Sequence, residues 1–232
     1  MALLGGLAFT AQAQVVIGDW QSSTAEGWIN PANGLSITDP SNVGEYSFVA
    51  AGVPGYGQSL QVTQAGFAST LQLNLSSIAG GLTAFNNNHL LSFTFSAPSS
   101  AASGSTAGYD QIYNVALNGP GYGYNNLSWS TATFVGNTAF NQPNSGPNYY
   151  YFAGSPQETQ TVTLDYSSAI APLIAGGEGY LQITFQSNNG GGAPTDFWMN
   201  NVELSGGPVP EPTSLALLGG GLLALGVIRR RK

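Results

Sequence analysis

Lysine and arginine are absent from residues 14–207, a stretch that carries ten acidic side chains and a single histidine. No ion pair with a lysine or arginine can stabilise this stretch, so its folding must depend on apolar burial and hydrogen bonds. Nucleic acids, anionic lipid surfaces and phosphorylated substrates all require basic partners, and the sequence excludes them as ligands of this region. Neutral polymers such as polysaccharides, together with cations, remain as ligand classes.

Catalytic side chains are also scarce. The chain has no cysteine, so it lacks disulfide bonds and thiol nucleophiles, and with one histidine a zinc site is excluded. His89 follows three asparagines at the start of an apolar segment and is interpreted as a strand-edge histidine. Glycoside hydrolysis needs two carboxylates at a defined separation, but the acidic residues stand singly, as at Glu158, Asp165, Glu178 and Asp196. We expect no enzyme activity; a carboxylate pair converging in one cleft would favour a glycan-active enzyme instead.

Alternation of apolar and polar residues is the main structural signal. Long runs of helix-forming residues are missing, and only residues 167–176 are expected to contain a helical turn, interrupted by Pro172. Seven segments alternate with period two: 59–63, 70–75, 91–95, 112–117, 161–166, 180–185 and 197–204. Turn-forming clusters lie at 55–57, 86–88, 119–121 and 188–192. The pattern predicts one all-β domain over residues 14–207, an antiparallel β-sandwich.

The C-terminal segment has a different composition. An apolar run from Ser214 to Ile228 is followed by all four basic side chains of the chain, Arg229, Arg230, Arg231 and Lys232. At a rise of ~1.5 Å per residue this run spans roughly 23 Å, less than the ~30 Å core of a bilayer. The pattern predicts one short C-terminal transmembrane helix with its basic end in the cytoplasm. The prolines on both sides of Glu211 predict an extended, accessible segment before it.

The order of these parts resembles the sorting signal of PEP-CTERM proteins. The resemblance covers residues 208–232 and consists of Val209, Pro210, Glu211 and Pro212, then the apolar helix, then the basic end. It implies that a membrane-embedded exosortase cuts near the Pro-Glu-Pro sequence and releases or transfers the protein at the cell surface. It also implies a Gram-negative host that makes an extracellular polysaccharide matrix or biofilm. The alternative is a plain C-terminal anchor with a proline-bounded linker.

The N-terminal residues predict export as well. Residues 1–13 combine an apolar run with Ala11 and Ala13 in the spacing of a signal-peptide cleavage site. A positively charged beginning is missing, which a truncated sequence or a start codon assigned too far downstream would explain. We therefore expect the mature chain to begin near Gln14. The alternative is a buried first strand.

A second, looser resemblance concerns the domain between the signals. The sequences at 19–21 (DWQ), 26–28 (EGW), 57–62 (GQSLQV), 159–165 (TQTVTLD) and 197–204 (FWMNNVEL) resemble jelly-roll carbohydrate-binding modules. The resemblance implies a jelly-roll sandwich over residues 15–204. It also implies that Trp20, Trp28 and Trp198 are core residues.

The same resemblance raises the question of a structural calcium ion. Such modules often hold calcium with acidic side chains on the first and last strands, whereas this chain has Gln21 and Asn200 at the matching positions. Amide oxygens can bind calcium, but the loss of both carboxylates lowers the affinity steeply. We expect no cofactor, and a calcium ion at Gln21 and Asn200 stays open as the alternative.

Aromatic residues are the candidates for ligand contact. Tyr122, Tyr124 and Trp129 follow a glycine-rich turn, and Tyr149 and Tyr151 follow Gly146-Pro147. Aromatic faces flanked by asparagine can stack on sugar rings while the amides bond the hydroxyl groups. The alternative is that alternate members of this set pack in the core.

Together these features predict an exported, non-enzymatic β-sandwich protein of the cell surface or extracellular matrix. Its expected partners are an exosortase-type protease and a neutral extracellular polysaccharide, with membrane attachment through the C-terminal helix before processing. The alternative of another class is a self-associating structural matrix protein that uses exposed strand edges and has no glycan site.

Overall fold

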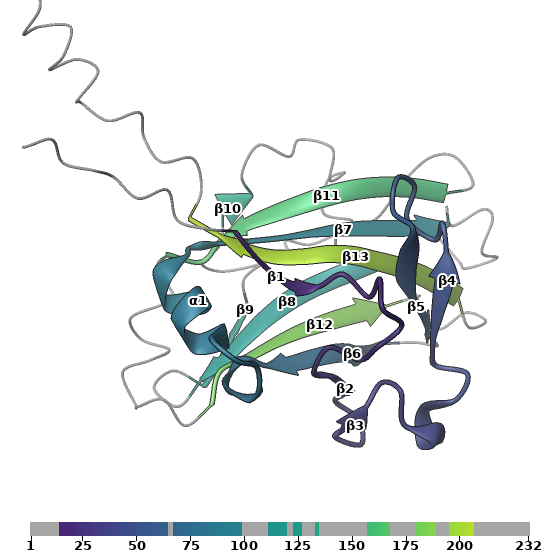
Figure 1. Cartoon of the computed structure of the whole chain (residues 1–232), viewed down its shortest axis with the longest axis horizontal. Helices are drawn as coiled ribbons and strands as arrows, with labels where there is room; N and C mark the ends of the chain where they lie inside the picture. The colour runs from purple at the N-terminus through teal and green to yellow at the C-terminus, as the bar shows by residue number, and fades with distance from the viewer. Residues whose placement is uncertain are drawn as a thin grey trace, which may run out of the picture.

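The computed structural model describes residues 14–64, 67–98, 111–119, 123–126, 133–134, 157–167, 180–188 and 195–206. Two β-sheets lie face to face as a sandwich, and helix α1 lies at one end of it (Figure 1). The strands are β1 Val15–Gly18, β2 Trp28–Asn30, β3 Leu35–Ser36, β4 Tyr46–Ala50, β5 Gln58–Gln64, β6 Phe67–Asn74, β7 Leu90–Pro98, β8 Gln111–Gly119, β9 Gly123–Asn126, β10 Thr133–Phe134, β11 Gln157–Asp165, β12 Gln182–Asn188 and β13 Thr195–Ser205. The helical segments are η1 Pro40–Asn42, η2 Leu75–Ser77 and α1 Gly81–Asn87.

Both sheets combine strands that follow one another in the chain with strands that are far apart in sequence. Sheet A has the order β10-β11-β7-β13-β5-β4, with β1 also paired to β13, and sheet B has the order β3-β2-β6-β12-β8-β9. The named strands pair antiparallel throughout. The predicted all-β antiparallel sandwich is confirmed. The seven predicted strands correspond to β5, β6, β7, β8, β11, β12 and β13.

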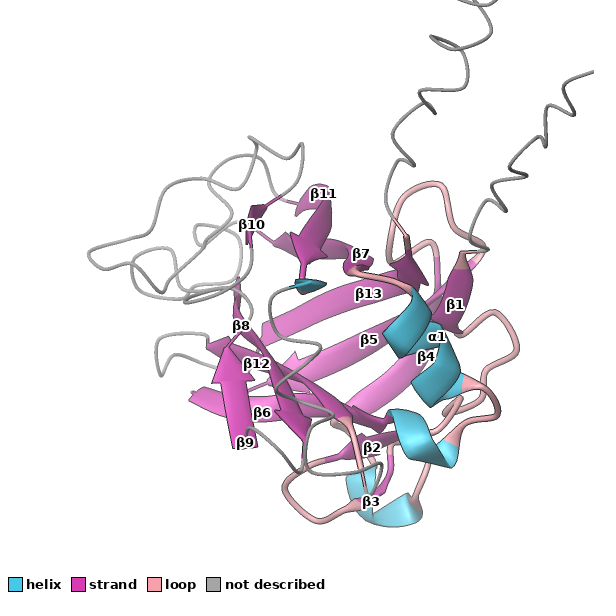
Figure 2. Ribbon diagram, turned by 90° about the vertical axis from the view of Figure 1, so that its left-hand side faces the viewer, coloured by secondary structure: helices cyan, strands magenta, loops and turns pink. Residues whose placement is uncertain are grey.

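One predicted turn is instead the end of a helix. Asn86 and Asn87 are the last residues of α1, and the Asn88 backbone N–H donates to the carbonyl oxygens of Ala84 and Phe85. The asparagine cluster therefore terminates a helix, because asparagine tolerates the end of a helix as readily as it forms turns. Figure 2 shows α1 beside the strands. Its Phe85 is fully buried and belongs to the hydrophobic core.

The core is built around aromatic side chains between the sheets. Trp20 and Trp28 are fully buried with ring centroids 5.9 Å apart, and Trp28 lies 5.7 Å from the ring of Phe185. The Trp28 indole N–H donates to the Ile17 carbonyl oxygen at 2.8 Å, so its polar atom is satisfied inside the core. The prediction that Trp20 and Trp28 are core residues is confirmed.

For Trp198 the core prediction is wrong. Trp198 lies opposite Ser96 and Gln61 in sheet A, on the face that points away from the sandwich, and it is only partly buried. Its indole N–H donates to Gln61 Oε1 at 3.2 Å. The reason is strand alternation: Phe197 and Met199 on either side are buried, so Trp198 must face outward.

Candidate functional site

Most of the predicted site residues lie outside the described residues. This applies to the sorting motif at Val209, Pro210, Glu211 and Pro212, to the basic end at Arg229, Arg230, Arg231 and Lys232, to the cleavage positions Ala11 and Ala13, and to the aromatic residues Tyr122, Trp129, Tyr149 and Tyr151. The predicted membrane span at 214–228 also lies outside them. In the described part of the chain, no helix has the length and apolarity needed to cross a bilayer. Tyr124 is placed by its backbone: it belongs to β9 and pairs with Asn118 of β8.

The side chains of Asp165 and Asp196 accept hydrogen bonds within the fold. Asp165 Oδ1 accepts from the Ser167 backbone N–H at 2.8 Å, and Asp196 Oδ1 accepts from the Thr63 hydroxyl at 2.6 Å. His89 lies directly before the first residue of β7, at the end of the strand, as the sequence predicts. Its backbone N–H donates to the Ser205 carbonyl oxygen, and its carbonyl oxygen accepts from the Tyr166 backbone N–H. The described residues hold no group of three or more histidine and acidic side chains that could bind a metal ion.

Two carboxylates, Asp19 and Glu26, do approach each other in the loop between β1 and β2. Glu26 Oε2 accepts from the Asp19 backbone N–H at 2.8 Å. Burial raises the pKa of Glu26, and the neighbouring charge of Asp19 raises it further, while the backbone N–H groups act in the opposite direction. Neither residue lines the pocket described below, and the hydrogen bond from the Asp19 N–H to Glu26 links the two ends of this loop.

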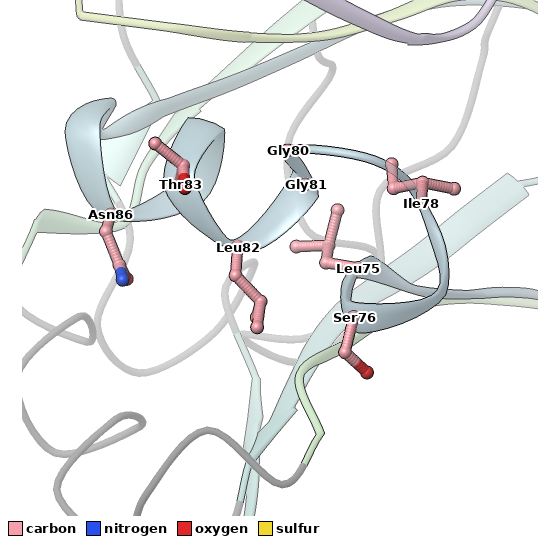
Figure 3. A pocket seen from close by; sticks show the side chains of 8 residues that line it. All are labelled: Leu75, Ser76, Ile78, Gly80, Gly81, Leu82, Thr83 and Asn86. Atoms are coloured by element: carbon pink, nitrogen blue, oxygen red, sulfur yellow. The ribbon is translucent and has the colours of Figure 1, made fainter.

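A pocket of about 270 Å³ lies between η2 and α1 (Figure 3). Its lining residues are Leu75, Ser76, Ile78, Gly80, Gly81, Leu82, Thr83 and Asn86. Every lining side chain is uncharged, and none gains or loses a proton near neutral pH. The lining therefore supplies no general acid or base, and its hydroxyl groups are those of Ser76 and Thr83.

A row of amide side chains begins beside this pocket on the outer face of sheet B. Asn74, Gln182 and Asn118 stand opposite one another on β6, β12 and β8, and we call them the polar row. The Asn118 amide donates to Gln182 Oε1 at 3.0 Å. In the backbone register, Asn118 of β8 lies opposite Tyr124 of β9.

An exposed tyrosine flanks the polar row. Tyr180 is 37% exposed and precedes Gln182 by two positions, while Leu181 between them is buried. Tyr180 and Gln182 therefore both face away from the core. In the next row toward the middle of the sheet, Thr184 and Ala116 are buried, whereas Gln72, which lies opposite Thr184, is partly exposed.

The polar row and the pocket share one corner of the sandwich. The Leu75 backbone N–H donates to the Leu181 carbonyl at 2.8 Å, which fixes η2 beside the start of β12. Asn74 Oδ1 accepts from the backbone N–H and hydroxyl of Ser76, at 3.1 and 2.6 Å, and so begins η2.

The outer face of sheet A offers less to a ligand. Three hydroxyl pairs cross from β7 to β11: Ser92 with Thr163, Thr94 with Thr161 and Ser96 with Thr159, at 2.8, 3.0 and 2.9 Å. The Tyr56 hydroxyl lies 3.2 Å from Thr94 Oγ1. Because the three β7 hydroxyls are buried and each is hydrogen-bonded to a threonine of β11, sheet B is the better candidate face.

A comparison with known protein families supports the interpretation of the C-terminal segment as a sorting signal. Residues 208–232 match the PEP-CTERM protein-sorting motif. The predicted resemblance to that signal is confirmed, and the match indicates an exported protein that is anchored through its C-terminus before it is processed by an exosortase. No curated protein sequence matches the chain.

Several solved structures are similar in fold at low sequence identity. A CBM28 carbohydrate-binding module specific for non-crystalline cellulose is 11% identical over 83% of this chain and 95% of its own, with a TM-score of 0.46. The CBM22-1 xylan-binding domain of Xyn10C from Paenibacillus barcinonensis is 11% identical over 85% of this chain and 97% of its own, with a TM-score of 0.43. The mannan-binding module TmCBM27 is 12% identical over 84% of this chain and 96% of its own, with a TM-score of 0.35.

Proposed function

We propose that this protein is exported, is cut by an exosortase near residues 209–212, and acts without enzyme activity at the cell surface or in the extracellular matrix, where its sandwich binds a neutral polysaccharide. The observation that carries the export and processing is the match of residues 208–232 to the PEP-CTERM protein-sorting motif. Asp165 and Asp196, whose carboxylates accept hydrogen bonds within the fold, support the absence of catalysis.

Polysaccharide is the ligand class because the ligand must be neutral and rich in hydroxyl groups. Residues 14–207 have no lysine or arginine with which to bind an anionic polymer. Tyr180 can stack on a sugar ring, and the amides of Gln182 and Asn118 can bond its hydroxyl groups. Tyr124 stands opposite Asn118, so the predicted aromatic set of Tyr122, Tyr124, Trp129, Tyr149 and Tyr151 has one member in register with the polar row.

Processing is tested by the mass of the mature protein from its native host. We expect a species that lacks the residues after the Pro-Glu-Pro sequence, because an exosortase removes the apolar helix and the basic end. Changing Glu211→Ala should lead to accumulation of the uncut chain in the inner membrane. Changing Glu203→Ala, in β13, is the matched control and should leave processing unchanged. A mature wild-type species that still ends in Lys232 would refute processing.

Binding is tested by affinity electrophoresis of the full chain against neutral polysaccharides. The double change Tyr180→Ala with Gln182→Ala removes one stacking face and one hydrogen-bonding amide, and we expect a loss of affinity of about tenfold or more. Gln61→Ala on sheet A, another partly exposed strand glutamine with a side-chain hydrogen bond, should bind like wild type. The double change Trp129→Ala with Tyr149→Ala tests the predicted loop contacts in the same assay.

Two results would contradict the proposed binding. If both double variants retain wild-type affinity, the ligand lies elsewhere on the protein. If the wild-type chain binds none of the polysaccharides and instead associates with itself as its concentration rises in sedimentation experiments, the protein is a structural matrix component.

A further inference from the structure

Gln21 and Asn200, which the sequence singles out as the calcium positions, meet at one backbone carbonyl. Gln21 Nε2 donates to the Gln58 carbonyl oxygen at 2.8 Å, and Asn200 Nδ2 donates to the same oxygen. Gln21 Oε1 in turn accepts from the Gln58 backbone N–H at 3.3 Å. Asn200 Nδ2 also lies 3.5 Å from Ser59 Oγ. We call Gln21, Gln58, Ser59 and Asn200 the Gln58 cluster.

The Gln58 cluster ties three separate segments together. Gln21 belongs to the loop after β1, Gln58 and Ser59 begin β5, and Asn200 lies in β13. Gln21 Nε2 also donates to the Asp19 carbonyl oxygen at 3.2 Å, so one amide group links the loop to itself and to β5. Asn200 and Ser59 are fully buried. The contacts hold the loop after β1 against β5 and β13.

These residues do not fit a calcium ion. Calcium takes six to eight oxygen ligands, usually with several carboxylates, but the Gln58 cluster contains none. The Asp19 and Gln58 carbonyl oxygens already accept amide N–H groups. The Asp19 carboxylate accepts from the Gln21 backbone N–H at 3.0 Å. Asn200 Oδ1 is buried without a hydrogen-bond partner, but one neutral oxygen does not make a calcium site.

We infer that the side-chain amides of Gln21 and Asn200 take the place of a structural cation, so that this sandwich folds and stays folded without calcium. An amide N–H offers a carbonyl oxygen the partial positive charge that a cation would supply, and it carries no ionic desolvation cost. This inference concerns the stability of the fold and is independent of the proposed polysaccharide binding.

Thermal unfolding of the full wild-type chain tests the inference directly. We expect the Tm in excess EGTA and in millimolar CaCl₂ to agree within about 1 °C, because a ligand that does not bind the native state cannot stabilise it. If the native state bound one calcium ion, a free calcium concentration of about a hundred times the Kd would raise the Tm of a domain of this size by roughly 5–10 °C. A rise of that size in the wild type, with one-to-one binding heat in calorimetry, would overturn the inference.

Carboxylates introduced into the Gln58 cluster give a second test. Asn200→Asp replaces the donor to Gln58 by an acceptor, and we expect its Tm in EGTA to fall by roughly 5–10 °C because two buried oxygens then face each other. In the double variant Gln21→Glu with Asn200→Asp, calcium should restore much of the loss. If the double variant is unfolded in EGTA, recovery of its circular dichroism signal on addition of calcium gives the same information.

A control variant separates this effect from the gain of a negative charge. Gln61→Glu adds a carboxylate to β5 two positions from Ser59 and keeps an acceptor for the Trp198 N–H. Its Tm should be the same in EGTA and in calcium. If Asn200→Asp is as stable as wild type in EGTA, the Asn200 amide is not holding the Gln58 carbonyl, and the inference fails.

Discussion

Changing Trp28→Ala is expected to lower the free energy of unfolding by about 3–5 kcal/mol, among the largest effects of any single truncation in this domain. Trp28 is fully buried, and its ring lies 5.9 Å from Trp20 and 5.7 Å from Phe185. Removing the indole leaves a cavity between the sheets and removes the donor to the Ile17 carbonyl oxygen. For a domain of this size the Tm should fall by roughly 8–15 °C, measured by circular dichroism.

Two further variants show which part of Trp28 matters. Trp28→Phe keeps an aromatic ring but leaves the Ile17 carbonyl oxygen without its donor, and it should cost about 1–3 kcal/mol. Val43→Ala is the control for apolar truncation, since Val43 is 83% exposed, and its effect should stay within about 0.5 kcal/mol. A loss of less than about 1 kcal/mol for Trp28→Ala would contradict the placement of this ring at the centre of the core.

The long strands could be predicted because alternation is a local signal that burial on one face imposes. In β6 the residues Leu71 and Leu73 are buried while Gln72 is partly exposed, and the sequence shows this pattern directly. The strands β2 and β3 have three and two residues, too few to show a period. Helix α1 was not predicted because its seven residues begin with Gly81 and end with two asparagines, and glycine and asparagine are both poor helix formers.

The candidate site could be predicted only in part, because it depends on strand register. Asn118 and Gln182 are 64 positions apart, and no local pattern indicates that they lie opposite each other. Trp198 illustrates the same limit: the motif that contains it predicts a core position, whereas alternation within β13 decides that it faces outward. The meeting of Gln21 and Asn200 at the Gln58 carbonyl likewise depends on the pairing of β13 with β5.

The absence of lysine and arginine from the domain is visible in how its strands are linked. Where many domains use surface ion pairs, this one uses neutral contacts such as Asn118 with Gln182, and Ser92 with Thr163. Neutral hydrogen bonds each contribute modestly to stability, so apolar packing must supply most of it. Substitutions that disturb packing should therefore destabilise the domain more than substitutions of surface polar residues. The tightly packed turn before α1 allows a second test of this expectation.

Changing Gly81→Ala is expected to lower the free energy of unfolding by about 2–3 kcal/mol and the Tm by roughly 5–10 °C. A Cβ atom at this position would lie 2.3 Å from the Leu75 carbonyl oxygen and 2.5 Å from Ile78 Cγ1. The Leu75 backbone cannot move away freely, because its N–H donates to Leu181. The start of α1 must shift instead.

That shift would reach the core through the helix. Phe85 in α1 stacks on Tyr166 with ring centroids 4.3 Å apart and an interplanar angle of 14°, and the Tyr166 hydroxyl donates to the Phe85 carbonyl oxygen at 3.1 Å. Near-ultraviolet circular dichroism of the Gly81→Ala variant should therefore change at the tyrosine bands even below its Tm. The matched control is Gly57→Ala, whose Cβ would meet only the side-chain end of Gln21, at 3.1 Å. If Gly81→Ala is no less stable than Gly57→Ala, the turn between η2 and α1 is looser than its contacts require, and the pocket that it borders would not be a fixed feature of the fold.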